Sequence, residues 1–201
     1  MMNKIKILAL GDSYTIGEDV AQSESWPFLL KRNLENKCFS VELKVVAKTG
    51  WTTGELDTAI EESNLGKNEY DLVFLLIGVN NQYRGYCIDK YRNEFRRLLL
   101  KAKTYSAYNS VFILSIPDWS CTPFAAEKDK ERISEEIDAF NRENFEVSES
   151  EGALYLSITG ISRRSADDHR YTASDGLHPS GYQYEKWVEK IMLKMDWSAL
   201  L

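Results

Sequence analysis

The chain has 201 residues, with 25 Lys and Arg against 31 Asp and Glu, and so carries a net charge of −6. Apolar residues make up 43% and charged residues 28%, which is ordinary globular usage and excludes disordered, collagen-like and low-complexity chains. The acidic balance argues against a dedicated binder of nucleic acid or anionic membrane, because such a protein needs a basic surface. We therefore expect a single globular domain over residues 1–201.

The sequence predicts no segment that crosses a membrane. The longest apolar run, residues 72–77, has six residues, whereas a transmembrane helix needs about 20. Met1–Leu10 contains one short apolar stretch and no small-residue cleavage site, which predicts a first strand rather than a secretion signal. The three cysteines, Cys38, Cys87 and Cys121, are scattered and form no Cys-x-x-Cys pair. This spacing favours reduced thiols in a cytoplasmic protein over a disulfide framework or a zinc site.

Short aliphatic and β-branched segments alternate with longer amphipathic ones. The predicted strands are Lys4–Leu10, Val41–Ala47, Leu72–Ile77, Val111–Ile116 and Ala153–Ile158. Several are apolar on successive residues, as in strands that are covered on both faces. The clearest predicted helices have apolar stripes between Ile88 and Ala102, between Glu127 and about Val147, and from Ser180 onwards. This alternation predicts right-handed βαβ units in a five-stranded parallel sheet with helices on both faces.

The working site of such a sheet lies beyond the carboxyl ends of its strands, and Ser13 follows the first strand within Gly11-Asp12-Ser13-Tyr14-Thr15. Ser13 is a candidate nucleophile, whose hydroxyl needs a positioned base to take its proton. Gly11 would allow a tight turn off the strand, and a serine near the start of a helix has a free backbone N–H that can face a developing negative charge. A serine after Gly-Asp is also an ordinary helix cap, so this segment alone leaves both interpretations open.

His178 is the candidate base. Asp175 stands three residues earlier, so its carboxylate can accept the Nδ1 hydrogen while Nε2 faces Ser13. Gly176 would permit the tight turn between them. The only other histidine in the sequence, His169, lies in a charged segment that we expect to be a solvated loop.

Acyl transfer also needs hydrogen-bond donors for the oxyanion of the tetrahedral intermediate. We expect the backbone N–H groups of Ser13 and Gly50 and the side-chain amide of Asn80 to supply them, since all three residues follow predicted strands. The lack of a side chain on Gly50 would allow close approach. Gly50 and Asn80 also have simpler explanations: Gly50 as a loop glycine, and Asn80-Asn81 as a plain turn.

Taken together, these blocks resemble the SGNH hydrolases, also called the GDSL esterase and lipase family, named for Ser, Gly, Asn and His in four blocks. Gly11-Asp12-Ser13 matches the first block, Gly50 the second, Gly78-x-Asn80 the third and Asp175-x-x-His178 the fourth. The Asp-x-x-His-Pro run that leads into a terminal helix is the most specific of these. Two positions depart from the family pattern: Tyr14 stands where the family name has Leu, and Asn81 stands where Asp is usual.

The resemblance implies a flavodoxin-like, three-layer α/β/α fold and serine hydrolysis of an ester without a metal or cofactor. The binding partner of the protein would be its substrate, a small ester or thioester of a lipid, sugar or small alcohol. In this mechanism Ser13 attacks the carbonyl, Asp175 orients His178, and water releases the acid from an acyl-serine intermediate. Activity should fall at acidic pH, because a protonated imidazole cannot act as the base.

Five aromatic residues fall in or near the strand-end loops: Tyr14, Trp51, Tyr83, Tyr86 and Trp119. We take Tyr14, Trp51 and Trp119 as candidate substrate contacts, because aromatic faces stack on sugar or aryl rings. An equally good explanation is that these side chains cover the core between loops. The sequence contains no apolar segment long enough for the lid of a long-chain lipase, which favours short acyl groups, acetyl first.

Two alternative functions remain at this point. The segment Gly11–Gly17 could hold a phosphate in a flavodoxin-like nucleotide-binding protein, although it lacks the Lys of a P-loop and the Gly-x-Gly-x-x-Gly spacing. A catalytically silent module that binds acylated ligands would carry the same residues at the same positions.

Overall fold

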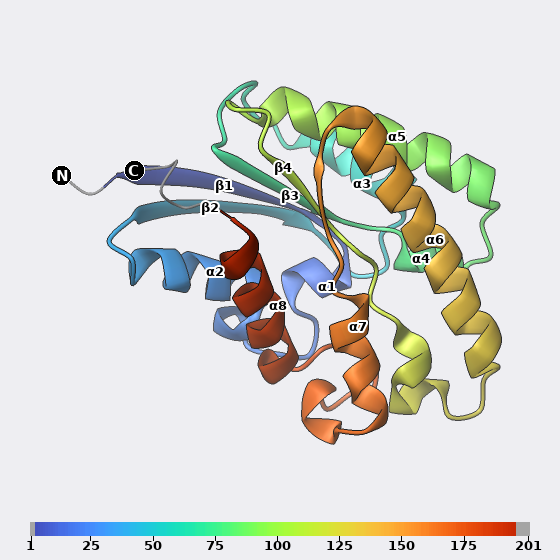
Figure 1. The fold of residues 1–201 in the computed structure, drawn as a ribbon. Helices are drawn as coiled ribbons and strands as arrows, with labels where there is room; N and C mark the ends of the chain where they lie inside the picture. The colour runs from blue at the N-terminus through green and yellow to red at the C-terminus, as the bar shows by residue number, and fades with distance from the viewer. Residues whose placement is uncertain (1–2, 196–201) are drawn as a thin grey trace.

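The computed structural model describes residues 3–195, which contain a sheet of five parallel strands (Figure 1). The strands are β1 (Lys4–Gly11), β2 (Ser40–Ala47), β3 (Leu72–Leu76), β4 (Val111–Leu114) and β5 (Leu154–Leu156). Their order, β2-β1-β3-β4-β5, is the flavodoxin-like one. Gly11 is in register with Ala47 of β2 and with Leu76 of β3, so these three strands end at one level. The predicted five-stranded parallel sheet is confirmed.

Helices cover both faces of the sheet (Figure 1). On one face α2 (Trp26–Glu35) packs against α8 (Gly181–Lys194); on the other, α5 (Ile88–Tyr105) packs between α3 (Thr53–Glu62) and α6 (Lys130–Glu151). The short helices α1 (Ser13–Ile16), α4 (Val79–Tyr83) and α7 (Thr159–Ser162) follow β1, β3 and β5. Single 3₁₀ turns are η1 (Gln22–Glu24), η2 (Trp119–Cys121), η3 (Pro123–Ala125), η4 (Arg163–Ala166) and η5 (His169–Tyr171). Within residues 3–195, no helix has the length and apolar character needed to cross a membrane.

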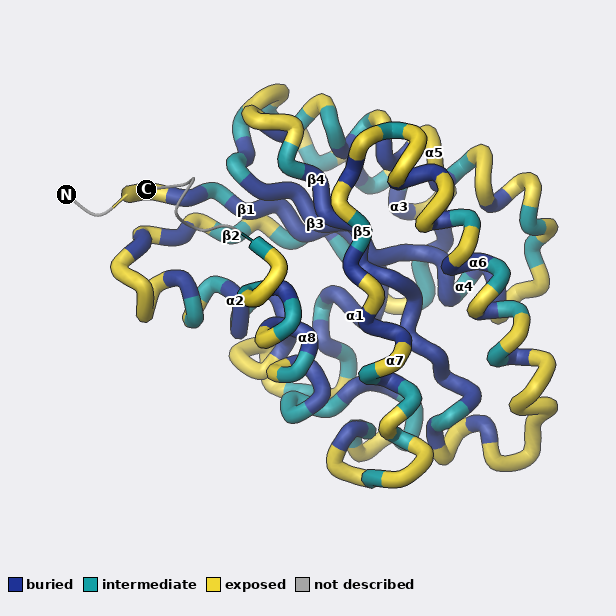
Figure 2. Tube along the Cα trace, in the orientation of Figure 1, coloured by how far each residue is buried: buried dark blue, intermediate teal, exposed yellow. Residues whose placement is uncertain are grey.

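The core lies along the middle of the sheet, where β3 and β4 are buried over their whole length (Figure 2). Trp26 of α2 packs on Phe74 of β3 with ring centroids 5.4 Å apart, and Phe74 stacks on Phe112 of β4 at 5.0 Å. Helices cover a central parallel strand on both sides, which is why its successive residues are all apolar. This packed core holds the strand ends, and therefore the loops that follow them, in fixed positions.

β3 ends at Leu76, one residue before the predicted Ile77. β4 and β5 each end two residues earlier than the sequence predicted, because polar side chains replace the hydrogen bonds of the sheet. β4 stops at Leu114. The N–H of Ile116 then donates to Asn141 Oδ1 at 2.7 Å, and its carbonyl accepts from Asn141 Nδ2 at 2.9 Å. Ser115 Oγ accepts from the N–H of Ile158 at 2.7 Å, beyond the end of β5. The prediction that strands continue to Ile116 and Ile158 was wrong.

Candidate active site

Ser13 lies just beyond the carboxyl end of β1, in the first position of α1. A Cβ atom on Gly11 would lie 2.5 Å from the carbonyl oxygen of Leu76 in β3, which leaves no room for a side chain. Asp12 caps α1 by accepting a hydrogen bond from the Tyr14 N–H at 3.0 Å. A Cβ there would also lie 2.1 Å from Thr15 Oγ1 of α1. Glycine is therefore required by the tight turn from β1 into α1, as predicted, and also by the close approach of β3.

A short turn before α8 holds Asp175 and His178 together. Asp175 Oδ1 accepts from the backbone N–H groups of Leu177 at 2.9 Å and His178 at 3.0 Å, and Oδ2 lies 2.5 Å from His178 Nδ1. Gly176 has a φ of +73° in this turn, as the sequence led us to expect. Partial burial alone would raise the pKa of Asp175, but hydrogen bonds from His178 and from the backbone of Leu177 outweigh it and hold that pKa below its ordinary value.

The imidazole of His178 connects this carboxylate to Ser13. His178 Nε2 lies 3.0 Å from Ser13 Oγ, although 165 positions separate the two residues. Both are buried, at 9% and 5% exposed, and the Tyr14 ring packs edge-on against the imidazole with ring centroids 5.6 Å apart. The structure thus brings together the two distant ends of the chain, and it places an imidazole within hydrogen-bond reach of the hydroxyl.

Asn80 lies at the same edge of the sheet, in the first turn of α4. The preceding Gly78 has a φ of +129°, and a Cβ atom there would lie 2.3 Å from Tyr91 Oη, so both conformation and space require glycine. Asn80 Nδ2 donates to the Trp51 carbonyl at 2.9 Å. A side-chain amide has two N–H donors, so this bond leaves one for a ligand of the pocket that Asn80 and Ser13 line.

Gly50 lies in the loop after β2 and is not among the residues that line this pocket. Its φ is +81°, and the nearest atom to a Cβ placed there would be Arg84 Nη2 at 3.7 Å. Its carbonyl accepts from the same Arg84 Nη2 at 2.7 Å. In the structure, the left-handed backbone is what requires glycine here. The expected reason, close approach to a substrate, stays a prediction.

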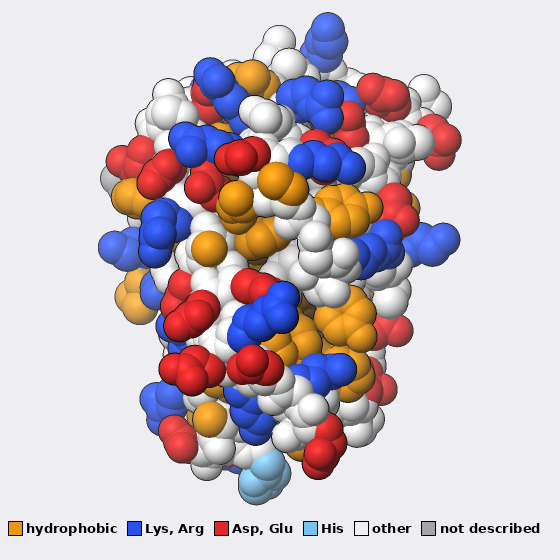
Figure 3. Space-filling model, turned by 90° about the vertical axis from the view of Figure 1, so that its right-hand side faces the viewer, with side chains coloured by type: hydrophobic (Ala, Val, Ile, Leu, Met, Phe, Trp, Pro, Cys, Tyr) orange, Lys and Arg blue, Asp and Glu red, His pale blue; other side chains and the backbone are white. Residues whose placement is uncertain are grey.

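A pocket of about 220 Å³, the serine pocket, lies beside Ser13. It is lined by Ser13, Tyr14, Val79, Asn80, Tyr83, Trp119, Phe124, Leu177 and His178. Among the predicted aromatic contacts, Tyr14 and Trp119 line the pocket, whereas Trp51 packs against the hydrophobic core. Figure 3 views the side of the molecule toward which the strands run, where hydrophobic side chains gather in the middle and charged side chains surround them.

Three apolar residues of the serine pocket, Val79, Phe124 and Leu177, were missed by the sequence analysis. Val79 follows β3 and Leu177 precedes His178, so their positions at the strand ends were the available signal. Phe124 lies in η3, and its N–H donates to the Gly176 carbonyl at 2.9 Å, which ties this turn to the loop of His178. Nothing in the local sequence predicts that contact.

Asp12 has an environment that the sequence did not reveal. It is fully buried, and within residues 3–195 its Oδ2 makes no hydrogen bond. Burial raises the pKa of Asp12 to about 7, and the hydrogen bond from the Tyr14 N–H offsets this in part. Because the Asp12 carboxyl already occupies this helix start, the alternative of a phosphate site at Gly11–Gly17 loses support.

Charged side chains of the 163–170 segment pair with other side chains of the protein. Arg163 Nε donates to the buried Asp118 Oδ2 at 2.9 Å, and Arg163 Nη2 donates to Asp138 Oδ1 at 2.8 Å. His169 is exposed, as expected for a solvated loop. Across residues 3–195, no group of three or more His, Cys, Asp or Glu side chains has an arrangement that could hold a metal ion.

Comparison with known proteins agrees with this geometry. The model of the GDSL-like Lipase/Acylhydrolase family matches residues 9–186, which is most of the chain. The chain belongs to this family. Membership makes the protein an ester-hydrolysing enzyme, as the resemblance implied. A search of curated proteins by sequence finds no match.

Several solved structures share the fold at low sequence identity. TesA is 19% identical with a TM-score of 0.72, and the match covers 98% of this chain and 99% of TesA. Axe2, an acetylxylan esterase from Geobacillus stearothermophilus, is 17% identical with a TM-score of 0.73 and 98% coverage of both chains. EstA is a psychrotrophic esterase from Pseudoalteromonas sp., and its structure was solved with the enzyme inhibited by monoethylphosphonate. It is 19% identical with a TM-score of 0.68, and the match covers 93% of this chain and 94% of EstA. These similarities confirm the flavodoxin-like α/β/α fold of the GDSL family.

Proposed function

We propose that this GDSL-family protein is a serine esterase that hydrolyses carboxylic esters of short acids through an acyl-serine intermediate. The observation that carries the proposal is the series Ser13–His178–Asp175, with 3.0 Å between hydroxyl and imidazole and 2.5 Å between imidazole and carboxylate. These three groups are in contact in the order that a catalytic triad requires. The family of lipases and acylhydrolases supports the same reaction class.

In the first half of the reaction, Ser13 Oγ attacks the ester carbonyl carbon while its proton passes to His178 Nε2. The Asp175 carboxylate stabilises the imidazolium that forms. The negative charge that develops on the carbonyl oxygen receives hydrogen bonds from the Ser13 N–H, the Gly50 N–H and the free N–H of Asn80 Nδ2. His178 then gives its proton to the leaving alcohol, the ester C–O bond breaks, and the acyl group remains on Ser13.

In the second half, a water molecule attacks the acyl-serine carbonyl while His178 Nε2 takes a proton from the water. The same donors stabilise the second tetrahedral intermediate. When that intermediate collapses, His178 returns the proton to Ser13 Oγ and the carboxylic acid leaves. The enzyme therefore ends the cycle in the state in which it began, with a hydrogen bond between the hydroxyl and the imidazole.

The serine pocket favours a short acyl group. Its volume is about 220 Å³, and the side chains that face Ser13 across it are mostly apolar or aromatic. A small apolar pocket suits an acetyl group better than a long chain. The alcohol part would be a sugar or another small alcohol, a proposal that the likeness to the acetylxylan esterase Axe2 supports.

Hydrolysis of p-nitrophenyl acetate by the Ser13→Ala variant tests the proposal. We expect kcat/KM to fall by at least about 10³-fold, because the variant has no nucleophile. The matched control is Ser150→Ala, whose hydroxyl donates to the Val147 carbonyl within α6, and it should retain the activity of the wild type. If Ser13→Ala were as active as the wild type, the acyl-serine mechanism would be wrong. A wild type that binds the ester without hydrolysing it would instead favour the silent acyl-ligand binder.

A further inference from the structure

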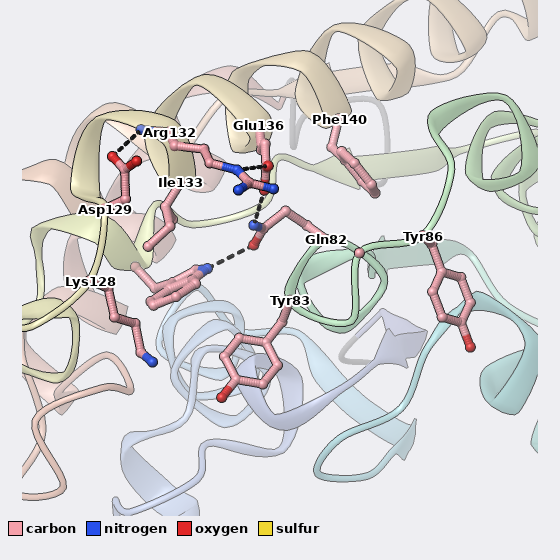
Figure 4. Close-up of a pocket in the computed structure, with 11 residues that line it drawn as sticks. Gln82, Tyr83, Tyr86, Lys128, Asp129, Arg132, Ile133, Glu136 and Phe140 are labelled. Carbon is pink, nitrogen blue, oxygen red and sulfur yellow. Dashed lines mark hydrogen bonds and ion pairs between the residues drawn. The ribbon is translucent and has the colours of Figure 1, made fainter.

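A second and larger cavity, the outer pocket, adjoins the serine pocket. Its volume is about 630 Å³, and it lies between α4, the Gly85–Tyr86 segment and the first turns of α6 (Figure 4). Tyr83 and Trp119 line both cavities, whereas Ser13 and His178 line the serine pocket and not the outer pocket. The side chains of Tyr83 and Trp119 therefore separate the two spaces, and we call this pair the wall.

Hydrogen bonds from two helices hold the Trp119 half of the wall. Trp119 Nε1 donates to Gln82 Oε1 at 2.8 Å, and Gln82 Nε2 donates to Glu136 Oε2 at 2.8 Å. Arg132 Nε donates to the other carboxylate oxygen of Glu136 at 2.8 Å, and Figure 4 shows Gln82, Glu136 and Arg132 joined in this way. Because Gln82 is itself buried, breaking this series would leave polar groups without partners, which opposes movement of the indole.

Ring contacts complete the wall. Trp119 is 4% exposed, and its ring meets those of Tyr83 and Phe124 with centroids 5.5 Å and 5.9 Å away. Tyr83 is 55% exposed, so the wall has one fixed half and one half at the surface. Ring packing from two directions, together with the hydrogen bond to Gln82, leaves the indole few alternative orientations.

We propose that the Trp119 indole, held by Gln82, limits the length of the acyl group that the serine pocket accepts. This inference rests on the proposed esterase function. His178 delivers a proton to the leaving alcohol, so the alcohol lies on the imidazole side of the ester and the acyl group extends away from it. An acyl chain that reaches the wall meets the indole, and the outer pocket directly behind it has about three times the volume. Trp119 is thus a specificity-determining residue for acyl length.

The test compares kcat/KM for p-nitrophenyl acetate, butyrate and octanoate in the wild type and in Trp119→Ala. We expect the wild type to prefer acetate. In Trp119→Ala, the ratio of octanoate to acetate should rise by roughly tenfold or more, mainly through a lower KM for octanoate, because the added methylene groups gain a pocket. A parallel series of alkyl acetates, in which only the alcohol lengthens, should show no such change.

Removal of a buried indole could unfold the protein, so Tyr83→Ala provides a second variant in the exposed half of the wall. It should raise the octanoate-to-acetate ratio in the same direction as Trp119→Ala. The matched control is Tyr86→Ala: Tyr86 lines the outer pocket but not the serine pocket. This control should leave the ratio within about twofold of the wild type, since it opens no passage between the cavities.

The possible outcomes distinguish failure of the proposed role of the wall from failure of the proposed esterase function. If the wall variants hydrolyse acetate but keep the wild-type ratio, or if Tyr86→Ala changes the ratio as much as they do, the wall does not limit acyl length. If alkyl acetates respond instead of the longer acyl esters, the wall faces the alcohol and the proposal is wrong. If the wild type hydrolyses none of these esters in a Ser13-dependent way, the esterase function fails, and the role of the wall fails with it.

Discussion

The Asp12→Asn substitution should remove a large part of the pH dependence of folding stability. Asp12 is fully buried beside Ser13, and burial raises its pKa from 3.8 to about 7. In the wild type, Asp12 Oδ1 accepts a hydrogen bond from the Tyr14 N–H at 3.0 Å. Asparagine has the same shape as aspartic acid and keeps an oxygen that can accept this bond. The variant therefore differs from the wild type mainly in its inability to ionise.

The sign and size of the effect follow from this pKa. A carboxyl group with a higher pKa in the folded than in the unfolded state contributes stability while it is protonated. For Asp12 that contribution is complete below pH 3.8 and is lost as the pH rises through about 7. The interval between these two values corresponds to roughly 4 kcal/mol in the free energy of unfolding, because one pH unit corresponds to about 1.36 kcal/mol.

Urea unfolding of both proteins between about pH 4.5 and about pH 8.5 measures this difference. The free energy of unfolding of Asp12→Asn, minus that of the wild type, should rise across this range by several kcal/mol. Asp168→Asn is the control, because hydrogen bonds from Arg170 lower the pKa of Asp168 to about 2, so its difference should change only below about pH 4. A difference for Asp12→Asn that stays constant, or that falls as the pH rises, would refute the reasoning.

Three further substitutions test single contacts of the site. Asn80→Ala should lower kcat for p-nitrophenyl acetate by about 10²–10³-fold with little change in KM, because an oxyanion donor acts mainly in the transition state; an unchanged kcat would remove Asn80 from the oxyanion site. Asp175→Asn should lower kcat by up to about 10⁴-fold, as the equivalent change does in serine proteases, and full activity would show that His178 needs no such partner. Asn81→Asp should lower the urea-derived free energy of unfolding by roughly 1–3 kcal/mol. Asn81 Nδ2 donates to Thr53 Oγ1 at 2.7 Å, and that hydroxyl donates to Glu94. A carboxylate at position 81 has no N–H to donate and would compete with Glu94 for the single hydroxyl hydrogen of Thr53. A variant as stable as the wild type would contradict this.

The convergence of Ser13 and His178 could be predicted from the sequence, because it follows from topology. Alternating apolar strands and amphipathic helices predict a parallel sheet, and the carboxyl ends of its strands meet at one edge. The turn at Asp175 could also be predicted, since a glycine follows it and the histidine stands three positions further along the chain. Both predictions depend on local pattern and on the general rules of parallel sheets.

Contacts between elements that are remote in the chain could not be predicted. Asn141 in α6 ends β4 from a position 25 residues away, and Gln82 in α4 meets Glu136 at a separation of 54. Their partners depend on how the helices pack, which hydrophobic periodicity does not specify. Gly11 shows the same limit: its place in the turn into α1 was predicted, but the second reason for a glycine, the neighbouring carbonyl of Leu76, lies on another strand.

The most direct test of the central claim is to identify the residue that reacts with a fluorophosphonate. A serine that a neighbouring base activates attacks the phosphorus of this reagent and displaces fluoride, and the tetrahedral phosphonate left on the serine resembles the intermediate of acyl transfer. Intact mass and peptide mapping of the wild type should show one adduct, on Ser13, and none on Ser13→Ala or on His178→Ala. An adduct on another serine, or equal labelling of the Ser13→Ala variant, would contradict the account.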